Sequence, residues 1–404
     1  MCCRRAAALL VLSCVATAVA QSPADLFNDA VLHDVQLRVN ARDWNALRQR
    51  FDQDTYYPAQ FNWSGTIVRD VGIRSRGFGS RNGQKPGLKI EFDRYRDGQR
   101  FAGLRSIVLD NHWQDPSMMR ERIAMRFYQR LGWPAPREAH ARLFVNDEYA
   151  GLYSIVEDVN EEFLQHHFGI TEETVVSRGY LYEYRWLENY FFTHIGRELE
   201  PYEERFEPKI KDHKSLAELV GPVEEMIRTI NEAEGDFESR AGDYLDLREL
   251  MTFLAIGSYI ADSDGFLGDF AVNNFFLARF DARRFERFIP WDRDNAFVFD
   301  QANPSRAIQW PILFGFDQNV LARKSIAVPS LRAVYLGQLQ RCADLAAGWM
   351  EGEIARMFNM IRDAAAADPV KPYSNAQVAE AVEFLRRFAQ ERPRIVREQV
   401  RLAQ

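Results

Sequence analysis

The periodicity of apolar residues changes near residue 157, and this change limits the folds open to the 404-residue chain. Before that point apolar and polar residues alternate over short segments, which is the pattern of half-buried β-strands. After it most apolar residues recur every three or four positions, as on one face of an α-helix. A strand-rich unit followed by a helix-rich unit is an α+β arrangement. Because about 380 residues exceed what one core usually serves, we expect two lobes, residues 21–157 and 158–404.

Shorter segments predict individual elements. Alternation predicts strands at residues 35–39, 66–68, 71–77, 88–92, 141–145 and 149–155. A helix is expected to start at Asp115, because Asp suits the N-cap and Pro116 suits the first helical position. Amphipathic helices are predicted in the second part at residues 215–230, 245–260, 330–357 and 374–400.

The first twenty residues have the features of an export signal and not of a folded element. Arg4-Arg5 precede an almost wholly small or apolar stretch at 6–19, and Ala18-Val19-Ala20 fits the small-residue rule for signal peptidase. Cleavage there would make Gln21 the first residue of an exported protein, whether periplasmic, cell-surface or extracellular. Processing as a lipoprotein at Cys14 is the second possibility, although the apolar stretch before this residue is very short.

Composition and missing motifs exclude several classes of protein. Three of the four cysteines lie in the leader, so cleavage would leave Cys342 alone and no intramolecular disulfide could form. The net charge of −7, without a run of Lys or Arg, gives no surface for nucleic acid. No stretch after the leader has the roughly 20 uncharged apolar residues of a membrane span. The sequence contains no His-Glu-x-x-His and no Gly-x-Ser-x-Gly, and Gly77-x-Gly79 is too short for a dinucleotide-binding motif.

A run of acidic and amide residues frames a β-hairpin predicted in the helical part. Asp264 follows the helix that is predicted to end at Ile260, Asn274 begins the hairpin and Asp292 ends it. Antiparallel pairing, with a turn at 281–283, would set Asn274 beside Asp292, and such hard oxygen donors suit Mg²⁺ or Mn²⁺. Enzymes that hold Mg·ATP and orient a hydroxyl nucleophile present these parts in the same order. Asp at a helix end and Asn in a turn are also common without any function.

The spacing leaves the identity of the catalytic base open. Asp264 lies just past a helix, as a catalytic-loop Asp would. Asp269 is a rival, because Asp269-x-x-x-x-Asn274 has the Asp-to-Asn spacing of ordinary protein kinases, and Asp262 is a weaker rival.

Seven short segments between Asp34 and Phe299 give the chain a likeness to a known family. They are RGFGS (76–80), KPGLKIEF (85–92), MRERIA (119–124), VNDEYAGLY (145–153), EDV (157–159), NNFFL (273–277) and IPWDRD (289–294). As an ordered set they resemble the CotH kinase family, the secreted atypical kinases named after spore coat protein H. The predicted helices at 330–400 follow this region.

The resemblance implies a two-lobed atypical protein-kinase-like fold, with a β-rich N-lobe, a helical C-lobe and ATP held between them. It implies that Asp264 is catalytic, since Asp264 aligns with the Asp of an Asn-x-Asp step in the family. This chain departs there, with Asp262 in place of the Asn and a longer loop before Asn274. Asp292 takes the metal-binding position, with Asn274 and Asp294 beside it.

The resemblance also implies which residues contact the nucleotide. Lys85 matches the leading Lys of a family strand motif and is favoured as the phosphate contact, whereas Lys89 lies mid-strand like the lysine of ordinary kinases. Glu121 would pair with that lysine, and Glu157, at the crossing between the lobes, would reach the nucleotide. An exposed helical position for Glu121 and a charge at a helix N-terminus for Glu157 are the ordinary alternatives.

We therefore expect an exported kinase that uses ATP with Mg²⁺ or Mn²⁺ to phosphorylate Ser or Thr of secreted or cell-surface proteins. One alternative is a catalytically inactive kinase-like scaffold of the cell envelope or spore coat, which the departure at Asp262 and the scarcity of extracellular ATP favour. Another is a surface protein that binds Ca²⁺ for structural purposes. The sequence indicates neither the acceptor nor the oligomeric state.

Overall fold

The computed structural model describes residues 21–169, 180–210, 214–279 and 285–404. The predicted leader at 1–20, with Cys2, Cys3 and Cys14, and the predicted hairpin turn at 281–283 lie outside the described residues. The strands are β1 (His33–Val39), β2 (Tyr57–Trp63), β3 (Thr66–Arg76), β4 (Gly87–Glu91), β5 (Ser106–Asp110), β6 (Glu138–Val145), β7 (Glu148–Glu157), β8 (Tyr180–Tyr184), β9 (Phe206–Pro208), β10 (Phe275–Arg279) and β11 (Phe285–Pro290). The helices are α1 (Pro23–Leu26), α2 (Ala41–Gln49), α3 (Arg120–Arg130), α4 (Glu161–Phe168), α6 (Glu200–Arg205), α7 (Leu216–Glu232), α8 (Phe237–Gly242), α9 (Leu247–Tyr259), α10 (Val320–Ala327), α11 (Pro329–Ala367) and α12 (Asn375–Ala403).

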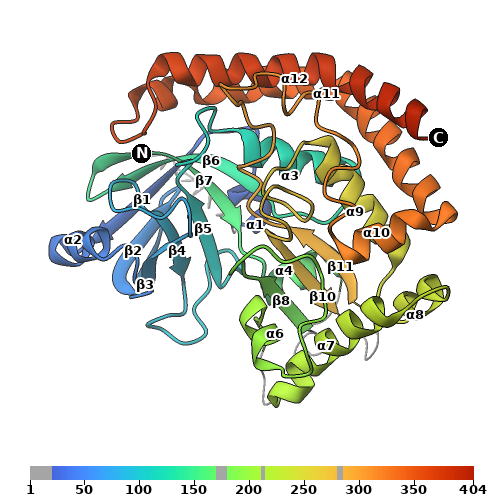
Figure 1. Cartoon of the computed structure of the whole chain (residues 1–404). Coiled ribbons are helices and arrows are strands. Elements are labelled where there is room, and N and C mark those ends of the chain that lie inside the picture. The colour runs from blue at the N-terminus through green and yellow to red at the C-terminus, as the bar shows by residue number, and fades with distance from the viewer. Residues whose placement is uncertain (1–20, 170–179, 211–213, 280–284) are drawn as a thin grey trace, which may run out of the picture.

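The first seven strands form a closed barrel (Figure 1). Their order is β1-β2-β3-β4-β5-β7-β6, and the parallel pairing of β1 with β6, which sets Leu37 opposite Val145, closes the barrel. Residues of β1 are alternately buried and exposed along its length, as the sequence predicted. The buried side chains of these strands form one hydrophobic core, which includes Val35, Phe61, Ile73, Ile90, Leu109, Leu143 and Tyr153.

A second sheet lies among the helices. Its four strands pair in the order β11-β10-β8-β9, and β10 and β11 form the predicted hairpin, with Phe275 opposite Pro290. One large hydrophobic cluster joins α9, α11 and α12 to α3, whose Ile123 and Phe127 are fully buried in it. The first part of the chain therefore contributes a helix to the core of the second part.

The α+β composition was predicted correctly, but the two-lobed protein-kinase-like fold was wrong. The first strands close on themselves instead of forming an open N-terminal sheet, because β1 pairs with both β2 and β6. The helices do not form a separate lobe either, since α11 and α12 run along one side of the molecule over the barrel and the helical part alike (Figure 1). The Tyr149 hydroxyl on β7 donates to the Ala364 carbonyl on α11 at 2.9 Å and so ties the barrel to the C-terminal helices.

The predicted start of α3 was also wrong. The helix begins at Arg120, because Met118 has a positive φ of 56° that interrupts any helix begun earlier. The Asp115 carboxylate does accept hydrogen bonds from backbone N–H groups, as a capping residue should, but its partners are Ser117, Met119 and Arg120. Asp115 therefore orders the turn that leads into the helix, not the first turn of the helix itself.

The C-terminal helices were predicted in place but too short. α11 continues to Ala367, beyond the predicted end at 357, and α12 runs to Ala403. Cys342 is buried on α11, as expected of a small apolar side chain. Among the described residues, no helix combines the length and the apolar character needed to cross a membrane.

Candidate functional site

The loop after α9 carries the predicted catalytic residue and follows a tight path. Asp246 caps the start of α9 by accepting from the N–H groups of Arg248 and Glu249, and the helix ends at Tyr259. Ala261, with a positive φ of 51°, then turns the chain away from the helix axis. Glycine is needed a few residues later at Gly265, where a Cβ would overlap the Asp262 carboxylate. The left-handed conformation of Ala261 and the small size of Gly265 therefore set the path of this loop.

Asp264 is the acidic residue that this loop presents to the hairpin. The side-chain amide of Asn273 donates to Asp264 Oδ1 at 2.8 Å, and that of Asn274 donates to Oδ2 at 3.1 Å and to the Asp264 carbonyl at 3.0 Å. Burial raises the pKa of the Asp264 carboxyl to about 6, although the hydrogen bond from Asn273 opposes this. Two amides thus orient a carboxylate that is ionised at neutral pH.

Asn274 and Asp292 lie at the same end of the hairpin, as the sequence predicted. The Trp291 N–H donates to the Asn274 carbonyl at 3.2 Å, so the residues that flank the paired strands are neighbours. Both Asn274 (φ 54°) and Asp292 (φ 51°) adopt the left-handed backbone region. Asn and Asp enter this region more readily than other non-glycine residues, and such conformations are concentrated at functional sites.

Asp292 belongs to a group of buried carboxylates. Burial raises its pKa to about 6, Arg76 lowers it, and Asp110 and Asp264 raise it further, while Asp294 is a hydrogen-bond partner. Burial followed by the charge of Asp292 raises the pKa of Asp294 well above its usual range. The hairpin end therefore concentrates negative charge in a place that is partly shielded from water.

Two glutamates extend this acidic group. Burial, followed by the charge of Glu138, raises the pKa of Glu121 well above its usual range, and Asp292 and Asp294 add to the effect. Burial raises the pKa of Glu138 to about 8, and within the described parts of the chain neither of its carboxyl oxygens has a hydrogen-bond partner. Glu121 is thus buried in this group and does not occupy the exposed helical position. In the described part of the chain, no group of three or more His, Cys, Asp or Glu side chains is arranged to hold a metal ion.

Sequence reasoning missed Asp110 and Glu138. Asp110 is the last residue of β5 and Glu138 is the first residue of β6, and neither belongs to a motif with a known spacing. An acidic residue at the end of an apolar strand was the only signal. Because barrel closure sets which strand ends meet, this signal could not be tied to the hairpin from the sequence.

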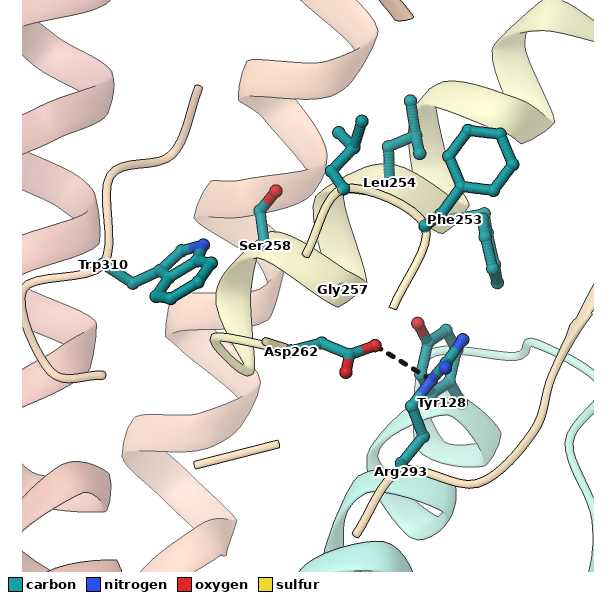
Figure 2. A pocket seen from close by; sticks show the side chains of 10 residues that line it. Tyr128, Phe253, Leu254, Gly257, Ser258, Asp262, Arg293 and Trp310 are labelled. Carbon is teal, nitrogen blue, oxygen red and sulfur yellow. Dashed lines mark ion pairs between the residues drawn. The ribbon is translucent and has the colours of Figure 1, made fainter. Parts of the chain in front are cut away.

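Asp262 forms a buried ion pair with Arg293 (Figure 2). Arg293 Nε lies 3.2 Å from Asp262 Oδ2, and the side chains are only 1% and 3% exposed. The pair lines a small pocket of about 20 Å³, together with Tyr128, Gly257 and Trp310. Because Arg293 lies between Asp292 and Asp294, the pair ties the loop that carries Asp264 to the loop that carries the two carboxylates.

The two candidate lysines are both engaged elsewhere. Lys85 Nζ is fully buried, 2.7 Å from Asp368 Oδ2, and donates to the Leu152 carbonyl at 2.8 Å. Lys89 Nζ lies 2.8 Å from Asp158 Oδ2. In the part of the chain that the structure describes, neither ammonium group therefore forms an ion pair with a carboxylate at the hairpin end.

Glu157 and Asp269 are also held by basic partners. Glu157 contacts Arg137, and His167 Nε2 lies 2.9 Å from its carboxylate. Burial alone would raise the pKa of Glu157, but the hydrogen bonds from His167 and Arg137 outweigh it and leave the pKa lowered. Asp269 binds Arg306 through both oxygens, at 2.5 and 2.7 Å. Asp264, and not Asp269, is thus the carboxylate that contacts Asn274.

Arg76, the first residue of the RGFGS segment, lies beside the acidic group. Its guanidinium carbon is 5.3 Å from the centre of the Trp291 ring, and its charge lowers the pKa of Asp292. The sequence showed Arg76 as part of a family segment but gave it no role.

Two comparisons with known proteins each cover most of the chain. A family model described as CotH kinase protein matches residues 73–396. The inner spore coat protein H of Bacillus subtilis (strain 168) is 25% identical over 349 residues, which cover 85% of this chain and 91% of that protein. Arg76, Asp264, Asn274, Asp292 and Asp368 all lie within the span of the family model.

Proposed function

Because this chain belongs to the CotH kinase family, we propose that it is a metal-dependent phosphotransferase that moves the γ-phosphate of ATP to Ser or Thr side chains of exported proteins. The contact between Asp264 and Asn274, at the end of the hairpin that leads into Asp292, is the observation that carries the proposal. In this arrangement a carboxylate that could orient an acceptor hydroxyl lies next to oxygen atoms that could bind a cation. Phosphoryl transfer requires both kinds of group.

Asp264 would orient the acceptor hydroxyl and take its proton. Its amide partners Asn273 and Asn274 fix the carboxylate, so little reorganisation is needed when the hydroxyl arrives. With a pKa of about 6, the carboxylate is ionised at neutral pH and still basic enough to accept a proton.

The donor set fits Mg²⁺ or Mn²⁺. Asp292 and Asp294 offer carboxylates, and Asn274 retains its amide oxygen because its amide nitrogen donates to Asp264. Mg²⁺ is commonly bound by one or two carboxylates with the remaining ligands from phosphates and water, so a complete protein cage is not required. When bound, the ion would neutralise charge that develops on the phosphate groups.

A direct test compares three Asp-to-Asn variants of the full chain. Asp292→Asn should abolish metal-dependent ATP binding, because the amide keeps the shape but loses the charge. Asp264→Asn should keep ATP binding and lower phosphate transfer on the order of 10²–10⁴-fold, since only proton transfer and positioning are removed. Asp269→Asn, whose carboxylate is bound by Arg306, is the control and should stay active. Binding is measured by calorimetry with Mg²⁺ or Mn²⁺, and transfer by autophosphorylation with labelled ATP.

An opposite pattern rejects the assignment. If Asp269→Asn loses turnover and Asp264→Asn keeps it, Asp269 is the base. If the wild-type chain binds no ATP with either ion, the proposed function is wrong.

A catalytically inactive coat or envelope scaffold is the second candidate. Two observations favour it: the related protein bears the name of a coat protein, and Asp262 stands where the family resemblance expects Asn. Metal-dependent ATP binding without phosphate transfer to any Ser- or Thr-containing protein would support this candidate over the enzyme.

A further inference from the structure

We infer that Arg76, rather than Lys85 or Lys89, supplies the positive charge that contacts the phosphate groups of the nucleotide. The inference rests on the proposed function and names the cation that the phosphate groups would meet at this site. Three observations support it: the partners of the lysines, the lack of an ion pair or hydrogen bond for Arg76 among the described residues, and the Trp291 ring beside the Arg76 guanidinium.

Lys85 is committed to a structural ion pair. Its ammonium and the Asp368 carboxylate are both 0% exposed, and the same carboxylate oxygen accepts from the Leu152 N–H at 3.0 Å. If Lys85 turned toward a phosphate, Asp368 would be left as a buried, uncompensated charge. Breaking such a pair is strongly unfavourable, so Lys85 is held away from the nucleotide.

Lys89 is committed to Asp158. The carboxylate of Asp158 is 12% exposed and also accepts from the Ser106 hydroxyl at 2.5 Å. Burial would raise the pKa of Asp158, but Lys89 and Ser106 lower it to about 2, which indicates a firm pair. Lys89 therefore balances a carboxylate at the end of the barrel and has no surplus charge to offer.

Arg76 differs from both lysines in the contacts of its side chain. It is the last residue of β3, and Gly77, with a φ of 106°, turns the chain directly after it. Among the residues that the structure describes, the Arg76 guanidinium has neither an ion pair nor a hydrogen bond. The guanidinium carbon lies 5.3 Å from the centre of the ring of Trp291, the residue that precedes Asp292. Its donors are thus available beside the carboxylates that would hold the metal.

The chemistry of the guanidinium suits this place. A planar guanidinium binds two phosphate oxygens at once and stacks on aromatic rings, whereas an ammonium group does neither as well. Stacking on Trp291 restricts the side chain before the ligand arrives, which lowers the entropy lost on binding. A polyphosphate that shares the metal with Asp292 would bring its oxygens within reach of Arg76.

The test measures binding of Mg·ATP and of Mg·pyrophosphate to the full chain by calorimetry. Arg76→Ala should weaken both roughly 10- to 100-fold, because charge-assisted hydrogen bonds are lost. Arg76→Lys should recover part of the affinity by restoring the charge without the planar fork. Lys89→Ala should bind ATP nearly as wild type does.

Arg94→Ala is the matched control. Arg94 also lies over an aromatic ring, with its guanidinium 4.4 Å from the centre of Tyr56, but at an exposed position of the barrel surface. This variant should leave nucleotide affinity unchanged. If Arg76→Ala keeps full affinity while Lys89→Ala loses it, Arg76 is not the phosphate contact and the proposed function is untouched. A wild-type chain that binds no ATP overturns both proposals.

Discussion

At the scale of single residues, Glu138 shows how the acidic group affects stability. Its pKa is about 8 in the folded chain, against an ordinary value of 4.5. Since the folded state holds the proton more tightly, the stability that this group contributes is fully present below pH 4.5 and is lost as the pH rises through 8. The folded chain therefore favours a neutral Glu138 at physiological pH.

Glu138→Gln should remove this dependence on pH. Because Gln resembles the protonated acid, the variant should match the wild type near pH 4, where Glu138 is protonated in both states, and be the more stable of the two near pH 9. The measurement is the midpoint of urea unfolding at both pH values. Glu148→Gln, at an exposed position of β7, is the control and should follow the wild type throughout. Equal midpoints of Glu138→Gln and wild type near pH 9 would show that Glu138 is ionised without penalty.

Individual site residues were predictable where the chain order carries the chemistry. The order of Asp264, Asn274 and Asp292 was enough to place them at one hairpin end, because a hairpin joins residues that are close in sequence. Arg76, Asp110 and Glu138 come from strands of the barrel, and their approach to the hairpin depends on how the whole chain closes. No local pattern encodes that approach.

At the scale of elements, the Asp262–Arg293 pair joins the loop after α9 to the loop after β11. Asp262 precedes the proposed base by two residues, and Arg293 separates the two proposed metal ligands. Although Asp262 differs from the Asn of the family step, its charge is balanced by a buried arginine. The carboxylate at this position thus has a buried counter-charge in this chain.

Arg293→Met should destabilise the protein by about 3–5 kcal/mol, because it leaves the Asp262 carboxylate buried and unpaired. The loss is measured as the free energy of unfolding in urea. Arg306→Met breaks the more exposed Asp269 pair, with side chains 36% and 31% exposed, and should cost only about 0–1 kcal/mol. Similar losses for the two variants would mean that the Asp262–Arg293 pair contributes no more than a surface pair.

Elements were predicted well where the local signals agreed. Apolar residues at helical spacing predicted α9 and α12. In the structure Asp246 and Ser374 cap the starts of these helices. The signals at Asp115 and Pro116 were equally strong but misleading, because the positive φ of Met118 breaks the helix they seemed to begin. Tertiary contacts set that conformation, and sequence patterns do not report it.

At the scale of the whole molecule, the Lys85–Asp368 pair joins the barrel to the end of α11. Gly151 makes room for it, since a Cβ there would lie 2.7 Å from both Asp368 carboxylate oxygens. The two-lobed prediction failed for a related reason. Its boundary was drawn where strand periodicity stops, whereas the parallel β1–β6 pairing and α11 connect segments that are distant in sequence.

Asp368→Asn should lower the free energy of unfolding by about 3–5 kcal/mol, because the Lys85 ammonium is left buried without a counter-charge. Nucleotide affinity of the folded variant should stay at the wild-type value, since the Asp368 carboxylate contacts the Lys85 ammonium and the Leu152 N–H and not Asn274 or Asp292. Unfolding in urea and ATP calorimetry on the same preparation check both statements. Asp34→Asn, which breaks the exposed Arg142 pair, is the control for stability. A stable Asp368→Asn variant that no longer binds ATP would return Lys85 to the nucleotide site.

The Lys85–Asp368 pair also matters while the chain is being synthesised. Its two residues are separated by 283 positions, so the ribosome makes Lys85 long before it makes Asp368. Until then the Lys85 ammonium can donate to the Leu152 carbonyl but lacks the counter-charge of Asp368. A chain that ends before Asp368 should therefore be less stable and more readily cleaved by proteases. The residue after α11 thus makes the stability of the barrel depend on a segment synthesised long after the barrel strands.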